Sequence, residues 1–175
     1  MRLDAIEQRI RRHASKGIIL DSNLLIIYLV GLHNPKEIER YLPGARKGQV
    51  VCFPTDFDVI KSFLLKYNVK KFVVTPHILT EVSNITFSDF PDTKMKEYIK
   101  HAVAFFKIST EHPASKDDLL KRHHLPLVGF SDASIIDTAK REECLVLTQD
   151  LQCMALLEAE GCCVYNMNHL RMTKL

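Results

Sequence analysis

The sequence predicts an α/β protein, a three-layer α/β/α sandwich with a mainly parallel central sheet. Short apolar runs such as 17–21, 71–75 and 144–148 have the length and the apolar character of strands buried on both faces. Segments with apolar residues at helical spacing lie between these runs, and strands that alternate with helices are typical of parallel sheets. Acidic residues stand at the edges of several apolar runs, and ligands of such sheets bind at the carboxyl ends of the strands.

The expected helices have apolar residues at helical spacing or begin at a capping residue. In chain order they cover 3–13, 22–30, 35–42, 55–68, 76–85, 92–105, a segment from 115 onward, 132–142 and 150–160. Thr55, Ser115 and Ser131 are the expected caps of the helices that start beside them. The run 22–30 also has strand propensity, and this alternative stays open.

The expected strands are apolar and end near polar residues or turns. They cover 17–21, 71–75, 144–148 and 162–166, and a further short apolar stretch occupies 106–110. The chain of 175 residues is long enough for one domain with a hydrophobic core, so we expect a single domain over 1–175. Residues 1–16 form a basic helix that precedes the first strand.

Composition excludes several classes of protein. Hydrophobic residues make up 46% of the chain, and no apolar run approaches the roughly 18 residues of a membrane span. The first residues lack the apolar core of a signal peptide, so we expect a cytoplasmic protein without membrane contact. The five cysteines form no CxxC pair, which favours free thiols over a zinc knuckle. The His123–His124 doublet is expected to be a solvated helix end.

Four acidic residues are the strongest functional signal, because each stands at the edge of an apolar run. They are Asp21, Glu81, Asp132 and Asp150. Carboxylates gathered at one sheet edge repel one another unless a cation lies between them, and oxygen ligands favour Mg²⁺ or Mn²⁺. With these four neutralised, 24 basic side chains face 17 acidic ones, which suits a polyanionic substrate.

Each acid also has a simpler interpretation. Asp21 could cap the helix that follows it, and Ser131 with Asp132 could cap another. Glu81 could be an ordinary surface carboxylate, with Ile78, Leu79 and Val82 on the buried face of the helix. Asp137 lies about 140° around the helix from Asp132, so we expect it to be solvated or ion-paired rather than part of the site.

Four segments together resemble the ordered motifs of the PIN domain family. They are ILDSN (19–23), TPHILTEV (75–82), SDASIIDTA (131–139) and LVLTQD (145–150), and the resemblance spans about 18–166. It implies a metal-dependent nuclease that acts on RNA and leaves a 5′-phosphate and a 3′-hydroxyl, with the four acids as catalytic Mg²⁺ or Mn²⁺ ligands. Ser22 and Asn23 would support Asp21 by hydrogen bonds, and Thr148 would contact a ligand or the substrate phosphate. Gln149 departs from the Asn that many members carry.

Rival families with an Asp after the first strand fit less well. A haloacid-dehalogenase-like phosphatase needs a second Asp at position 23, and an integrin-type metal site needs serines at 23 and 25, where Asn23 and Leu25 stand. The acidic pair, acceptor Asp and Lys of a receiver domain are also missing. The main alternative is a catalytically weak PIN-like module that binds RNA or protein in RNA processing.

The resemblance also implies partners. Many small PIN proteins are toxins of toxin–antitoxin pairs, so an antitoxin or other protein, a second copy of the chain and RNA are the expected partners. Two features depart from a minimal toxin, the helix 1–16 and the long stretch 24–80. They would shape an RNA groove, form an oligomer interface or extend the core.

Overall fold

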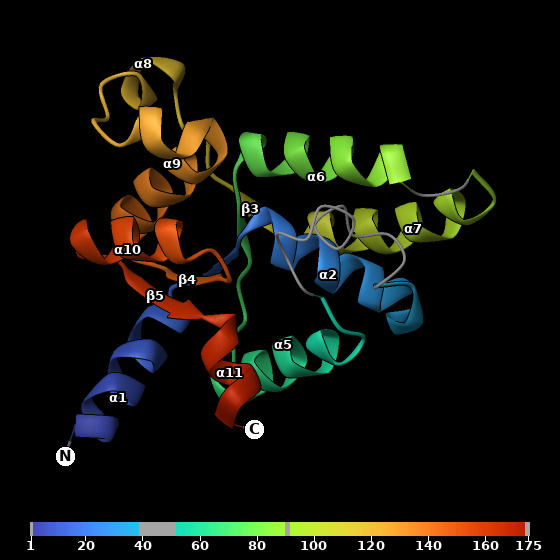
Figure 1. The fold of residues 1–175 in the computed structure, drawn as a ribbon, viewed down its shortest axis with the longest axis horizontal. Helices are drawn as coiled ribbons and strands as arrows, with labels where there is room; N and C mark the ends of the chain where they lie inside the picture. Colours follow the sequence, from blue (N-terminus) through green and yellow to red (C-terminus); the bar gives the residue numbers. More distant parts are fainter. Residues whose placement is uncertain (1, 39–51, 90–91, 174–175) are drawn as a thin grey trace.

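The computed structural model describes residues 2–38, 52–89 and 92–173 and has an α/β fold, mostly helical with a small parallel sheet (Figure 1). Strands β1 (Ile18–Leu20), β4 (Leu145–Thr148) and β5 (Cys163–Asn166) pair in parallel in the order β1-β4-β5. Strands β2 (Val73–Val74) and β3 (Thr110–Glu111) form a second parallel pair. The expected α/β class with parallel strands is confirmed.

One parallel bridge, from Ile18 to Phe72, joins the two strand pairs. The strands therefore follow one another in space as β3-β2-β1-β4-β5, with β1 in the middle. Every residue of β1 and β4 is buried, as expected for strands covered on both faces. The strand β2 is shorter than the predicted run 71–75, because only Val73 and Val74 pair with β3.

Helix α1 (Arg2–Ala14) packs beside β4 and β5 and extends the core through Ile10 and Ala14. The guanidinium group of Arg9 donates to the carbonyl oxygen of Cys162 at 2.9 Å. Cys162 precedes β5, so this contact lies at the amino ends of the strands, opposite to the edge where Asp21 follows β1. The N-terminal helix therefore supports the core rather than the candidate site.

Helix α2 (Ser22–His33) is surrounded by other elements, which explains why its sequence is apolar on all sides. It contacts α5 (Thr55–Lys66), α6 (Pro76–Asp89) and α7 (Asp92–Ile108), and a short 3₁₀ helix, η1 (Pro35–Glu37), follows it. Gly31 permits the close approach of α5, because a Cβ atom there would lie 2.3 Å from the Phe57 ring. The helical interpretation of 22–30 is confirmed, and its strand alternative is wrong.

The remaining elements lie in the second half of the chain. They are α8 (Lys116–Leu119), α9 (Leu125–Glu142), α10 (Leu151–Ala159) and α11 (Met167–Thr173). The expected cap at Ser115 is confirmed, since its hydroxyl accepts from the Asp118 amide at 3.1 Å. Helix α11 was not predicted from the sequence.

Several predicted boundaries need correction. Thr55 is the first residue of α5 and not its cap, because Pro54 takes the cap position and the Asp56 carboxylate accepts the Phe53 amide at 2.9 Å instead. Ser131 does not begin its helix, since α9 starts at Leu125. The predicted helix 35–42 begins with η1, and its residues after Ile38 lie outside the described ranges. Across the described ranges, every helix is too short or too polar to cross a membrane.

Candidate metal centre

Asp21 lies directly after the central strand β1 and is 5% exposed. Its Oδ1 accepts the Leu24 amide at 2.7 Å, so Asp21 does cap α2. Its Oδ2 accepts the Gln149 amide at 3.1 Å and the Thr148 hydroxyl. A carboxylate has about four acceptor positions, so Oδ1 keeps one for another ligand. The cap and the ligand interpretations of Asp21 are therefore compatible.

Asp150 follows the neighbouring strand β4 and caps α10 in a similar way. Its Oδ1 accepts the Gln152 amide at 2.7 Å and the Cys153 amide at 2.9 Å, and the other oxygen stays available. The hydroxyl of Thr148 accepts the Asp150 amide at 3.0 Å and donates to Asp21. Thr148 is fully buried, and its hydroxyl links Asp21 to Asp150 from the core side of the site.

Glu81 reaches the site from α6 and is held by a serine of α2. The Ser22 hydroxyl donates to Glu81 Oε2 at 2.6 Å and lies 3.4 Å from the Ser131 hydroxyl. Ser22 was expected to support Asp21, whereas its hydroxyl in this structure donates to Glu81, the acid of a different element. In the described part of the chain, the partly exposed Asn23 side chain makes no hydrogen bond to Asp21.

Asp132 stands on α9 just after a kink, where Gly129 has a φ of 77° that favours glycine. Burial raises the pKa of Asp132 to about 7, with further contributions from the negative charges of three other acids and a lowering contribution from the Cys153 thiol. The three acids are Asp21, Asp150 and Glu81. The predicted residues are thus close enough to repel one another.

The pKa of Asp21 is also raised, to about 6, first by burial and to a lesser degree by the charge of Asp150, although three hydrogen bonds oppose the shift. A raised pKa means that the surrounding protein compensates the negative charge of the carboxylate poorly. Within the described residues no positive side chain pairs directly with these four acids. A cation would supply the missing compensation.

The spacing of the four acids differs from that of a tight ligand cage. Among the described residues, no three of them bring their oxygens within 4.8 Å of one another. Mg²⁺ is commonly held by one or two carboxylates and several waters, so direct contact with all four acids is not required. The donor set consists of oxygens with unused acceptor positions, and it fits a hard divalent ion bound partly through water.

Asp137, on the same helix as Asp132, has a different environment. It is 8% exposed and forms ion pairs with Arg122 and with Arg141, the latter at 3.7 Å. The ion-paired interpretation of Asp137 is confirmed, and the solvated one is wrong.

Sequence reasoning missed two residues beside the site. The guanidinium group of Arg171 on α11 binds Asp56 at 2.6 and 2.9 Å and the side chain of Gln149 at 3.3 Å. The buried thiol of Cys153 donates a hydrogen bond to the carboxylate of Asp132. Cys153 lies one helical turn after Asp150, so its position in the sequence indicated that it would lie beside the site. Nothing in the sequence indicated the same for Arg171.

A pocket of about 460 Å³ adjoins Glu81 between α6 and α9. The rings of His77 and Phe130 line it, stacked with their centroids 6.1 Å apart and their planes 9° apart. Phe130 is 46% exposed, and Asn84 and Ser131 add polar groups to the lining. An aromatic surface of this kind next to a carboxylate cluster can receive a flat ring.

The expectation of a solvated His123–His124 doublet is wrong for His124, which is 2% exposed. Together with Glu160 these histidines form the only group of three or more candidate metal ligands found within 4.8 Å in the described ranges.

Comparisons with known proteins provide no family for this chain. No protein-family model matches it, and no curated protein or solved structure matches it either. The functional argument therefore depends on the residues and their arrangement.

Proposed function

We propose that this protein is a metal-dependent endoribonuclease of the PIN type, with Mg²⁺ or Mn²⁺ held by Asp21, Glu81, Asp132 and Asp150. The observation that carries the proposal is that Asp21 and Asp150 directly follow the neighbouring parallel strands β1 and β4, where the Thr148 hydroxyl contacts both residues. The charges of the other three acids also contribute to the raised pKa of Asp132, which supports the same grouping. These acids come from four elements and act on one another at the carboxyl edge of a parallel sheet. The proposal includes helices on both faces of that sheet, as in a three-layer sandwich.

The strand order supports this location. The chain passes from β1 to β2 on one side and later returns to β4 on the other side of β1. In open α/β sheets, ligands bind in the crevice between two neighbouring strands from which the chain continues toward opposite edges of the sheet. Asp21 follows β1 and Asp150 follows β4, so both acids border this crevice.

The residues of the chain would bind and orient the reacting groups. A bound divalent ion lowers the pKa of an attacking water and neutralises charge on the phosphate and the leaving oxygen. Thr148 and the Gln149 amide fix the orientation of Asp21, and Ser22 fixes that of Glu81. The two amides that Asp150 caps donate to its Oδ1, which leaves Oδ2 for water or a ligand, and Asp132 is partly exposed, so either carboxylate could accept a proton from water.

The pocket beside Glu81 supports a nucleic acid substrate. Single-stranded RNA is commonly recognised by stacking of its unpaired bases on aromatic side chains. His77 lies one helical turn before Glu81 on α6, and Phe130 of α9 stacks on it, so a base could lie there while its phosphate lies among the acids. The positive net charge of +3 is compatible with a polyanion.

A cleavage assay with charge-removing variants tests the proposal. Purified protein would be incubated with labelled single-stranded and hairpin RNAs in Mg²⁺, Mn²⁺ or EDTA, and the product ends would be identified. Asp150→Asn is a sharp variant, because Asn is also a good helix cap and can keep both amide contacts at Oδ1. Asp117→Asn is the matched control, since this acid is exposed on α8.

We expect metal-dependent cleavage that leaves 5′-phosphates, a loss of at least about 100-fold in Asp150→Asn, and an unchanged rate in Asp117→Asn. Equal cleavage by both variants would reveal a contaminating nuclease and would contradict the proposal.

One observation favours a second function, a weakly catalytic module that binds RNA or protein. In the described part of the chain no three of the four acids bring their oxygens within 4.8 Å of one another. RNA binding that survives EDTA, without cleavage in either metal, would support this alternative.

A further inference from the structure

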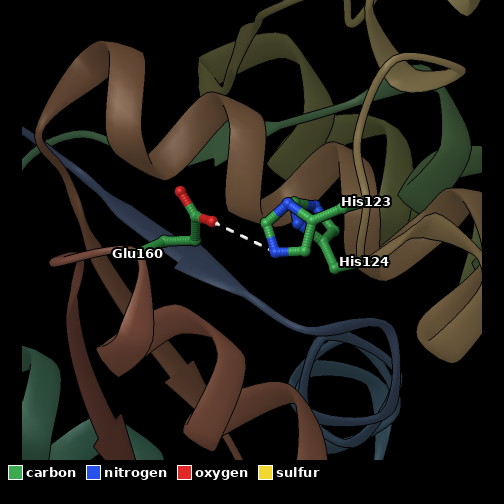
Figure 2. A group of neighbouring side chains, drawn as sticks. All are labelled: His123, His124 and Glu160. Carbon is green, nitrogen blue, oxygen red and sulfur yellow. Dashed lines mark ion pairs between the residues drawn. The ribbon is translucent and has the colours of Figure 1, made fainter.

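His123, His124 and Glu160 converge at the side of the molecule where α8, α9 and α10 meet (Figure 2). Their candidate ligand atoms all lie within 4.8 Å of one another, and His123 Nε2 is 3.8 Å from Glu160 Oε1. The two imidazole rings meet edge to face, with centroids 5.2 Å apart. Figure 2 shows the Glu160 side chain extending toward the rings from the end of α10.

These separations are close to those of a metal site. Tetrahedral zinc with bonds of about 2.0–2.2 Å holds its ligand atoms roughly 3.3 Å apart. The 3.8 Å contact between His123 and Glu160 therefore needs only a small adjustment of two side chains. His123 is largely exposed, so an ion can reach the cluster from solvent without any opening of the core.

The buried histidine of the cluster provides an independent observation. His124 is 2% exposed, and within the described part of the chain neither of its ring nitrogens has a hydrogen-bond partner. Buried polar groups are nearly always satisfied, and an exception indicates a missing water or ion.

The charges around the cluster leave room for a cation. Lys140 binds Glu160 through Oε2 at 2.7 Å, and the nearest contact of His123 is to the other oxygen, Oε1. Arg122 is paired with Asp137, so its charge is already balanced. A metal would thus share Glu160 with Lys140 rather than displace it.

We propose that His123, His124 and Glu160 form a second metal site, selective for a transition metal ion such as Zn²⁺. Two imidazoles and one carboxylate suit Zn²⁺, Ni²⁺ or Cu²⁺, whereas Mg²⁺ prefers the all-oxygen set of the candidate metal centre. The site is chemically distinct from that centre and does not depend on nuclease activity.

Occupation of this site would tie the start of α9 to the end of α10. His124 stands at the N-cap position of α9, and Glu160 directly follows α10 at its C-cap position. Asp132 also lies on α9, and Asp150 directly precedes α10. The metal would therefore stabilise the relative position of two elements that contribute acids to the candidate metal centre.

A zinc titration of the full chain tests the site. Metal-stripped protein without a polyhistidine tag would compete with a zinc-sensitive dye in the presence of excess Mg²⁺, which keeps the four-acid site from contributing. His123→Ala removes an exposed ring, and Glu160→Gln keeps a hydrogen-bond partner for Lys140. His101→Ala is the matched control, because His101 lies near His33 in a different histidine pair, with ring centroids 6.0 Å apart.

We expect one zinc ion per chain, at least tenfold weaker binding in His123→Ala and in Glu160→Gln, and wild-type affinity in His101→Ala. Melting curves in EDTA would check that each variant is folded. If His123→Ala is not folded, the zinc affinity of Glu160→Gln tests the proposal instead. Wild-type affinity in a folded His123→Ala or Glu160→Gln variant would overturn the proposal, as would wild-type protein that fails to bind zinc.

Discussion

Replacement of Asp132 by Asn should make the metal-free protein more stable. The pKa of this carboxyl group is raised from 3.8 to about 7, mainly by burial and then by three neighbouring acids. At pH 8 the folded protein must therefore keep a charge that its surroundings disfavour. Asn has the same shape without the charge, so the variant avoids this cost.

The magnitude follows from the size of the shift. About three pKa units at about 1.36 kcal/mol each correspond to about 4 kcal/mol. Asp132 is partly accessible to water, and screening reduces the expected gain to about 2 kcal/mol. For a chain of 175 residues this gain corresponds to a rise of about 4–8 °C in Tm.

The pH dependence has a definite sign. Folded protein binds the Asp132 proton more tightly than unfolded protein does, so the wild type loses stability as the pH rises from about 4 to about 7. The variant lacks this loss. The gain in Tm from Asp132→Asn should therefore be larger at pH 8 than at pH 5.

Thermal melts in EDTA and in Mn²⁺ provide the assay. Mn²⁺ should raise the Tm of wild type, by an amount equivalent to about 2.7 kcal/mol at 100 times the Kd, and should raise that of the variant less. Asp137→Asn is the matched control on the same helix, and it should lower the Tm because Asp137 is buried and paired with Arg122 and Arg141. A lower Tm for Asp132→Asn at pH 8 in EDTA, or equal effects at both pH values, would refute the reasoning.

Two further predictions concern the residues that support the site. Arg171→Met should lower the free energy of unfolding by about 3 kcal/mol in a urea titration, because Asp56, which is 1% exposed, loses its two-point partner; a change below about 1 kcal/mol would show that the pair is weak. Thr148→Val removes the hydroxyl between Asp21 and Asp150, so we expect about 1–2 kcal/mol of destabilisation and a higher pKa for Asp21, measured by NMR titration of the carboxyl carbon. An unchanged Asp21 titration would contradict this role.

Local sequence patterns were sufficient for much of the fold. The apolar runs at 17–21 and 144–148 became β1 and β4, because buried parallel strands need side chains that avoid water on both faces. Asp150 and Ser115 cap helices as their positions suggested, since capping involves residues only two or three apart. The same patterns located Asp21 and Asp150 just after strands, whereas Glu81 and Asp132 lie within α6 and α9.

Other features were outside the reach of local patterns. Helix α11 has no strong apolar period, and it is held by the ion pair between Arg171 and Asp56, which are 115 positions apart. Thr55 fits the rule for a helix cap, but the neighbouring Asp56 carboxylate took the amide of Phe53. Such outcomes depend on competition between groups that only packing brings together.

The sequence by itself determined the alternation of most strands and helices, the positions of Asp21 and Asp150 just after strands, and those of Glu81 and Asp132 on helices, because hydrophobic periodicity and capping are local properties. Tertiary structure alone decided which partners those acids have. Ser22 supports Glu81, which is 59 positions away, rather than its neighbour Asp21. His124 is buried beside Glu160 although its sequence context is polar. Burial and mutual repulsion, which set the raised pKa of Asp132, arise only when distant segments pack into one structure.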